Sequence, residues 1–287
     1  MKSLLFLLIP AIFVAVNGRE IRQIVKEALE GLAGNWQSLT DDFTDDRKIR
    51  QIMLRNRQYD IPGGRETGKD TGFVCDSWRF AVETNNLREW KKVPDKCQEY
   101  VGVYMTGDRY ESDSEIVSGE AENFARNISI LGDGKDVWVF DIDETLLSNL
   151  PYYAENGFGS KDFNEDSFNE WVVKAEAPAL PYSLKLYNEL KKLGFRVILL
   201  TGREESQRTV TAENLIAAGY DSWERLILRG AKDSGKPAVV YKSEKRMEIE
   251  GEGYRIHGNS GDQWSDLLGF AIGNRSFKLP NPMYYIS

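Results

Sequence analysis

The sequence is poor in the residue types that bind zinc and other soft metals. Its 287 residues include one histidine, His257, and two cysteines, Cys75 and Cys97. Structural zinc sites usually take four cysteine or histidine ligands, so the sequence does not favour such a site. Two cysteines in an oxidising compartment most simply form one disulfide, and we predict that Cys75 pairs with Cys97. His257 is predicted to be an ordinary strand residue.

The chain also lacks an apolar run long enough to span a bilayer. Residues 4–16 form an apolar stretch that Pro10 interrupts, whereas a membrane-spanning helix needs about 20 residues. Lys2 precedes this stretch and Asn17 and Gly18 follow it. This pattern predicts a secretory signal peptide over residues 1–18. We therefore expect the protein in the secretory pathway, bound for the extracellular space, the cell wall or the vacuole, without stable membrane association.

Positive charge is scarce as well. The sequence holds 37 Lys and Arg against 45 Asp and Glu, a formal net charge of -8. This balance argues against a nucleic acid or an anionic membrane as partner. Two Asn-x-Ser sequons, at Asn127 and Asn274, are permitted glycosylation sites in a secreted chain. The sequons permit glycans at both sites, and the sequence alone leaves their use open.

Two regions differ in their hydrophobic pattern. Residues 19–132 are predicted to form a mainly helical N-terminal region, because apolar residues recur there at helical spacing. From residue 133 onward, short apolar strands alternate with helical stretches that stop near glycines. This alternation predicts an α/β fold with a mainly parallel sheet covered by helices on both faces. The predicted strands are residues 137–140, 195–200, 225–228 and 254–257.

Polar residues follow three of these strands at the point where each strand ends. The first strand, in the stretch "VWVFDIDETLLSN", closes on Asp141 and Asp143. The second runs into Thr201, and the fourth runs into "GNSGDQWSD", with Asp262 and Asp266 four residues apart. Ligands bind at the carboxyl ends of the strands in parallel sheets. We therefore expect these residues to converge on one site.

The residue types indicate phosphoryl chemistry that depends on a metal ion. Two close carboxylates repel each other unless a cation or a proton intervenes, and an oxygen-seeking cation such as Mg²⁺ fits them. A carboxylate beside Mg²⁺ can attack phosphorus and form an aspartyl-phosphate. A second acid, shifted toward protonation, can donate a proton to the leaving oxygen. Hydroxyl and backbone N–H groups at Thr201 and Gly202, together with a lysine, would hold the phosphoryl oxygens.

Three motifs resemble those of the haloacid dehalogenase (HAD) superfamily, in the family order: "DIDET", "LLTGR" and "GDQWSD". Further stretches resemble the plant acid phosphatase and vegetative storage protein family, which is class B acid phosphatase-like. They are "CDSWRFAVETNNLREWKKVPDKC", "YESDSE", "LLSNLPYYAENGFG", "YKSEKR" and "GNSGDQWSDLLG". The resemblance covers roughly residues 73–287. It implies a Rossmann-like three-layer sandwich over residues 133–287 with a small flap or cap insert at about 151–178.

The resemblance implies a role for each matching acid. Asp141 would be the nucleophile and a Mg²⁺ ligand. Asp143 would be the general acid and base, with its backbone carbonyl on the metal. Asp262 would ligate Mg²⁺, with Asp266 either next to it at the metal or behind it without touching the metal, and Thr145 would support the loop.

Phosphate binding would fall to Thr201, Gly202 and a lysine. Lys242 in "VVYKSEKR" is predicted to be that lysine, and Lys236 in "SGKPAVV" is the competing candidate. The insert holds several aromatic residues. They would either pack a small flap core or line the entrance for the apolar part of a phosphate ester.

The predicted function is that of a secreted or vacuolar acid phosphatase. It would hydrolyse small phosphomonoesters through an aspartyl-phosphate with Mg²⁺. The alternative is a vegetative nitrogen-storage protein with weak or incidental phosphatase activity. Phosphoryl transfer to an acceptor other than water also stays open. The resemblance further implies a homo- or heterodimer.

Overall fold

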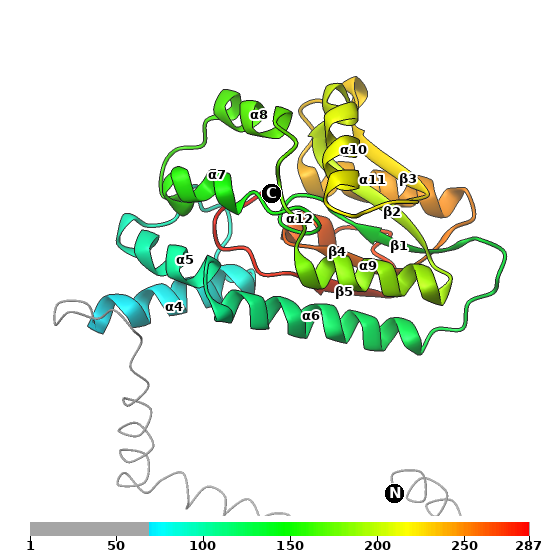
Figure 1. Ribbon diagram of the computed structural model, residues 1–287, viewed down its shortest axis with the longest axis horizontal. Coiled ribbons are helices and arrows are strands. Elements are labelled where there is room, and N and C mark those ends of the chain that lie inside the picture. Colours follow the sequence, from blue (N-terminus) through cyan, green and yellow to red (C-terminus); the bar gives the residue numbers. More distant parts are fainter. Residues whose placement is uncertain (1–68, 287) are drawn as a thin grey trace, which may run out of the picture. The chain divides into compact units, whose positions relative to one another are not determined.

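A five-stranded parallel sheet organises the part of the chain that the computed structural model describes, residues 69–286 (Figure 1). The strand order is β3-β2-β1-β4-β5, and each neighbouring pair is parallel. The mainly parallel sheet predicted from the sequence is therefore confirmed. The strands are β1 (Asp136–Phe140), β2 (Arg196–Glu204), β3 (Arg225–Arg229), β4 (Arg255–Gly261) and β5 (Arg275–Lys278).

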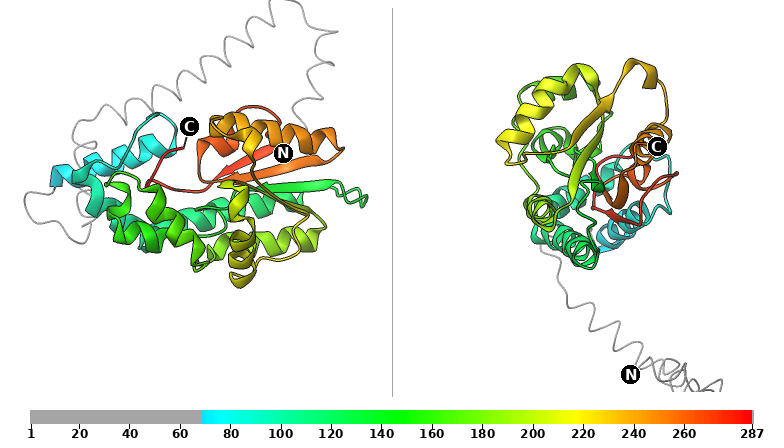
Figure 2. Two further views of the ribbon diagram at one scale, coloured as in Figure 1. Left: turned by 90° about the horizontal axis from the view of Figure 1, so that it is seen from above. Right: turned by 90° about the vertical axis from the view of Figure 1, so that its right-hand side faces the viewer.

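Helices cover both faces of this sheet, which gives three layers (Figure 2). On one face lie α6 (Asp108–Arg126), α9 (Pro181–Leu193) and α10 (Arg208–Ala217), and on the other lies α11 (Ala238–Gly251). Side chains of β1 alternate between the faces, as in any extended strand. Trp138 and Phe140 join the core with α6 and α9, whereas Val137 and Val139 join the core with α11. β1 is thus buried on both sides, which explains its continuous apolar sequence.

Three further helical segments precede the sheet: α4 (Lys69–Glu83), the short 3₁₀ helix η1 (Asp95–Cys97) and α5 (Gln98–Met105). The predicted disulfide between Cys75 and Cys97 is present and joins α4 to η1. These segments belong to the same compact unit as the sheet, Glu66–Ser287. The predicted signal peptide and the predicted helices of residues 19–60 lie outside the described residues.

The insert after β1 contains α7 (Leu150–Glu155), the 3₁₀ helix η2 (Gly157–Gly159) and α8 (Glu165–Val173). Most of its aromatic side chains pack with those of the N-terminal helices in one core, including Tyr152, Tyr153 and Phe168. Phe163 is the exception and is exposed. The insert therefore shares its core with α4 and α5.

The chain after β4 forms α12 (Trp264–Leu267) and β5. Beyond β5, residues 279–286 have no regular secondary structure and run from the sheet toward α7 (Figure 1). We call these residues the C-terminal segment. The sequence did not predict β5, because its four residues "RSFK" place only Phe277 in the core.

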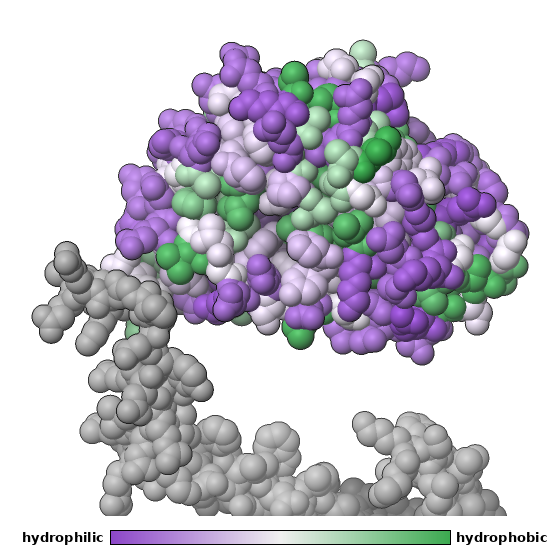
Figure 3. Space-filling model, in the orientation of Figure 1, coloured by the Kyte–Doolittle hydropathy of each residue, from purple (hydrophilic) through white to green (hydrophobic). Residues whose placement is uncertain are grey.

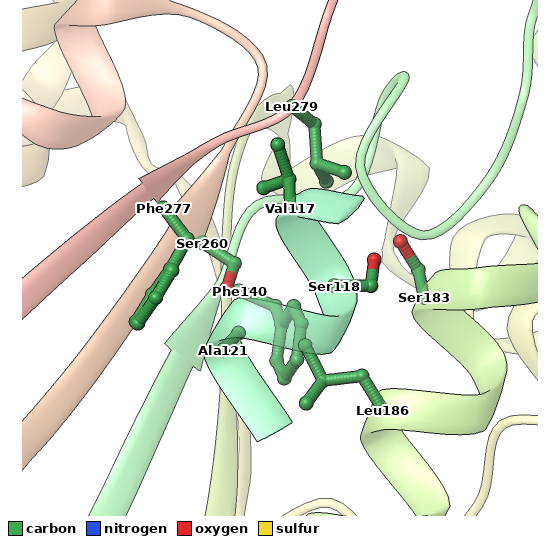
Figure 4. A pocket seen from close by; sticks show the side chains of 9 residues that line it. All are labelled: Val117, Ser118, Ala121, Phe140, Ser183, Leu186, Ser260, Phe277 and Leu279. Atoms are coloured by element: carbon green, nitrogen blue, oxygen red, sulfur yellow. The ribbon is translucent and has the colours of Figure 1, made fainter. Parts of the chain in front are cut away.

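A narrow gap separates α6 from α9 beneath the sheet (Figure 4). Ser118 of α6 and Ser183 of α9 line it, and neither hydroxyl has a hydrogen-bond partner among the described residues. The gap has no room for a water molecule. It is a packing imperfection and offers no space for a ligand.

Figure 3 shows a face on which hydrophilic side chains predominate and hydrophobic ones form small groups. No helix among residues 69–286 combines the length and the apolar character that crossing a membrane requires. Both predicted glycosylation sites are exposed: Asn127 ends α6 and Asn274 precedes β5. A glycan could reach either side chain without disturbing the core.

Candidate active site

The carboxyl edge of the sheet brings three predicted site acids together. Asp141 directly follows β1, Asp262 directly follows β4, and Asp266 lies in α12. One carboxylate oxygen of each lies within 4.8 Å of the others, and all three side chains are buried. The Asp141 N–H donates to the Ser260 carbonyl over 3.0 Å, which joins the chain after β1 to the end of β4.

Gly261 permits this close approach. A Cβ atom at this position would lie 2.4 Å from Cβ of Asp266. Any side chain at residue 261 would therefore push Asp266 away from Asp262. Lack of space for a side chain thus explains why a glycine occupies this position of the "GDQWSD" motif.

Lys242 of α11 completes the cluster. Its Nζ donates to Oδ1 of Asp141 over 2.5 Å and also to Oδ1 of Asp266. The competing candidate, Lys236, instead donates to Asp233 over 3.0 Å and to Glu244 over 2.5 Å. The geometry thus places Lys242 in the cluster and Lys236 outside it.

The cluster holds three carboxylates and one lysine, and Lys242 contacts only Asp141 and Asp266. Burial raises the pKa of Asp141 well above its usual range; Lys242 opposes this rise, and the neighbouring acids add to it. Burial and the charge of Asp266 raise the pKa of Asp262 to about 7. A set of buried oxygen donors in which carboxylates outnumber the cations fits a hard divalent cation. The cluster is therefore compatible with a divalent metal ion.

Asp143 does not join this cluster. Its carboxylate accepts hydrogen bonds from Nη2 of Arg203 over 2.7 Å and from Nδ2 of Asn149 over 2.8 Å. Burial raises the pKa of Asp143, but Arg203 and Asn149 outweigh burial, and the pKa lies below its usual value. From the sequence, a raised pKa was predicted for this second acid. Because Arg203 supplies a buried counter-charge, the structure shows the opposite shift.

Thr201 and Gly202 lie in the last part of β2, where its pairing with β3 is irregular between Leu200 and Glu204. The Thr201 side chain is buried, and its hydroxyl accepts the Arg203 N–H over 3.1 Å. Gly202 is exposed, and no heavy atom lies within 4 Å of the place where its Cβ would be. Gly202 therefore leaves open space beside this end of β2, as expected for a position that binds part of a ligand.

Glu144 is a buried acid of the first motif to which the sequence analysis gave no role. Its backbone has a φ of 52°, and its carboxylate accepts from the Asn149 N–H over 2.5 Å and from the Tyr284 hydroxyl. Burial and the charge of Asp143 raise the pKa of Glu144 to about 8. The neighbouring Thr145 donates to Oδ1 of Asp262 over 3.2 Å. The "DIDET" loop is thus held by contacts from several elements.

Sequence reasoning missed Arg203 and Asn149 as partners of Asp143. Arg203 was visible as the charged residue of "LLTGR", at a strand end that the analysis had already identified. Asn149 gave no such signal, because it lies in a loop without periodicity.

The family model described as HAD superfamily, subfamily IIIB (acid phosphatase), matches residues 65–287. Acid phosphatase 1 of Solanum lycopersicum is 57% identical over 212 residues, which is 74% of this chain and 83% of the relative. The stem 28 kDa glycoprotein of Glycine max is 48% identical over 74% of this chain and 84% of its own length. Vegetative storage protein 2 of Arabidopsis thaliana is 42% identical over 74% and 80%.

A solved structure shares the fold. It is the class C acid phosphatase from Bacillus anthracis, with a TM-score of 0.54 and 24% sequence identity. The alignment covers 67% of this chain and 86% of that one. The three-layer arrangement is therefore one already known from an acid phosphatase.

Proposed function

Because the chain belongs to subfamily IIIB of the HAD superfamily, the acid phosphatases, we propose that it hydrolyses small phosphomonoesters through an aspartyl-phosphate on Asp141. The observation that carries this proposal is the buried cluster of Asp141, Asp262 and Asp266 around Lys242. It provides a nucleophile, a cation-binding set and a fixed positive charge at one edge of the sheet.

In the first step, a carboxylate oxygen of Asp141 attacks phosphorus and the bond from phosphorus to the ester oxygen breaks. Lys242, Thr201 and Gly202 would hold the phosphoryl oxygens during this attack. Asp143 gives a proton to the leaving oxygen. In the second step, Asp143 takes a proton from water, which attacks phosphorus and releases inorganic phosphate and Asp141.

Arg203 has a consequence for this cycle. While it holds Asp143 ionised, Asp143 is ready to accept a proton from water. Donation to the leaving group requires Asp143 to be protonated first, which acidic solution favours. The ion pair therefore supports the proposal that the enzyme works best at acidic pH.

We propose Mg²⁺ as the cation. Asp141, Asp262 and Asp266 would hold it, together with the backbone carbonyl of Asp143. A bound Mg²⁺ would supply positive charge that offsets and orients the phosphate. Oxygen donors alone make up the cluster, which is the preference of Mg²⁺ and not of soft metals.

The test is release of phosphate from 4-nitrophenyl phosphate, measured with and without EDTA. We expect turnover at acidic pH that EDTA abolishes and added MgCl₂ restores. In the Asp141→Asn variant, turnover should be lost while the fold is kept. An active Asp141→Asn variant would refute the nucleophile.

A storage role has relatives on its side but no feature of the site. Lys242 contacts Asp141, and Asp143 lies outside that cluster in contact with Arg203; a pure storage protein would not need these buried charged contacts. The disulfide between Cys75 and Cys97 supports passage through the secretory pathway. A dimer, and glycans at Asn127 and Asn274, are further parts of the proposal. Light scattering and glycosidase treatment of the purified protein would test them.

A further inference from the structure

Two side-chain amides converge on one oxygen of Asp262. Nδ2 of Asn281 donates to Oδ2 over 2.8 Å, and Nε2 of Gln263 donates to the same oxygen over 2.7 Å. The other oxygen, Oδ1, receives only the longer hydrogen bond from Thr145. Asp262 and Asn281 are each 1% exposed, so water does not replace these contacts. The carboxylate is thus fixed at Oδ2 and available at Oδ1.

The C-terminal segment orients both amides. The Met283 N–H donates to Oδ1 of Asn281 over 2.9 Å, and the Ile286 N–H donates to Oε1 of Gln263 over 2.9 Å. Each amide must therefore turn its carbonyl toward the backbone of the segment. Its NH₂ group then faces Asp262, and the reverse orientation would lose two hydrogen bonds.

The segment is itself anchored from several sides. Glu83 of α4 accepts from the Asn281 N–H over 2.9 Å and from Nζ of Lys278 over 2.8 Å. The ring of Tyr284 stacks on Tyr153 of the insert, with centroids 5.2 Å apart. Contacts from the N-terminal helices and the insert thus reach Asp262 through these few residues.

We propose that the C-terminal segment is a positioning element for the cation site, and that Asn281 is its central residue. It holds Asp262 so that Oδ1 faces the cluster with Asp141 and Asp266. Residues behind a metal ligand commonly set its orientation, and their loss weakens metal binding about 10- to 100-fold. The inference rests on the proposed function only in taking Asp262 as a cation ligand.

The decisive experiment titrates MnCl₂ into the metal-free full chain and follows free Mn²⁺ by its EPR signal. Asn281→Leu keeps the side-chain size and removes the amide. We expect it to bind Mn²⁺ about 10- to 100-fold more weakly than the parent. Binding within about twofold of the parent would overturn the proposal, since a tenfold loss is the smallest effect expected.

Asn214 offers a matched control. It is also a buried asparagine, and its amide contacts the backbone of Ala177 on both sides, at 2.8 Å and 3.2 Å, and none of the site acids. Asn214→Leu should lower the melting temperature and leave Mn²⁺ affinity unchanged. If Asn214→Leu weakens Mn²⁺ binding as much as Asn281→Leu does, general destabilisation is the cause and the proposal fails.

A second variant covers the case in which Asn281→Leu does not fold. Ile286→Pro removes the N–H that fixes Gln263, at a residue that is 46% exposed. We expect a smaller but measurable loss of Mn²⁺ affinity, and an unchanged affinity would overturn the proposal. A parent that binds Mn²⁺ but releases no phosphate would refute the proposed function and leave this inference standing. A parent that binds no Mn²⁺ would refute the inference whatever its turnover.

Discussion

β1 begins with a buried acid and is followed directly by another, and the pKa values of the two acids are shifted in opposite directions. Asp136, its first residue, is surrounded by partners: Arg255 donates to it over 2.8 Å and His257 lies 2.7 Å away. These hydrogen bonds, with Arg255 the main one, hold the pKa of Asp136 well below its usual range. Asp141, just past the other end, has a raised pKa despite Lys242.

The difference separates stability from function along one strand. At the amino end, each charge has a partner, so the cluster stabilises the fold. At the carboxyl end, carboxylates outnumber cations, and the folded protein carries an electrostatic strain that a bound cation would relieve. Perturbed acids of the second kind are typical of functional sites.

The largest effect should come from Asp141→Asn. Turnover of 4-nitrophenyl phosphate is expected to fall about 10⁴-fold or more, as for other nucleophile variants. In EDTA at pH 7, its melting temperature should match or exceed that of the parent. A raised pKa means that the ionised acid opposes folding above its unfolded pKa, so a neutral amide removes that opposition. A melting temperature clearly below that of the parent would contradict the inference that ionised Asp141 opposes folding.

Lys242→Met should rank next. It removes the cation that the cluster shares, and we expect kcat to fall by about 10²- to 10³-fold, the effect of losing one electrostatic contact in the transition state. Lys236→Met is the matched control, because Lys236 pairs with Asp233 and Glu244 instead. Its kcat should stay close to that of the parent. If Lys236→Met lowers kcat and Lys242→Met does not, Lys236 is the lysine that binds phosphate.

Asp136→Asn should have the opposite profile. We expect it to lower the free energy of unfolding by about 1–3 kcal/mol, since buried partners lose their acceptor, with kcat near that of the parent. A lowered folded pKa contributes stability above the unfolded pKa of about 3.9 and loses it as the pH falls further. Urea unfolding at pH 7 and at pH 3 should therefore show the difference between parent and variant shrinking at pH 3. A difference that is the same at both pH values would contradict this assignment.

The smallest expected effect is a shift in a pH profile. Arg203→Gln removes the counter-charge that lowers the pKa of Asp143. Because leaving-group protonation needs protonated Asp143, the alkaline limb of the kcat profile should move to higher pH. Arg208→Gln is the control, since Arg208 pairs with Glu205 on the surface, and it should leave the limb in place. An unmoved limb in Arg203→Gln would separate Arg203 from proton transfer.

The two ends of β1 show which features of the site could be predicted from the sequence and which could not. The strand β1 and the site residue Asp141 after it could be predicted, because the carboxyl ends of parallel strands meet at one edge of the sheet. The partners of Asp136 could not be predicted, since Arg255 and His257 lie about 120 residues later and look like ordinary strand residues. Periodicity marks the strand but does not show which side chains pair across it.

The same limit applies to the contacts behind the site. Asn281 follows Asp262 by 19 residues in a stretch without helix or strand pattern, so no spacing rule points to it. β5 was missed for a related reason, because a short edge strand with two charged residues has too little apolar pattern. Irregular chain is positioned by specific tertiary contacts, and these become visible only in the folded structure.

The position of the C-terminal segment has a consequence for synthesis. Asp141 leaves the ribosome about 140 residues before Asn281, which at 5–20 residues per second is roughly 7 to 28 seconds. Through that interval, the nascent chain can pair β1 with β2 and β2 with β3, but β4, Asp262 and the amides behind it are still being made. The candidate active site is therefore among the last parts of this fold to be assembled.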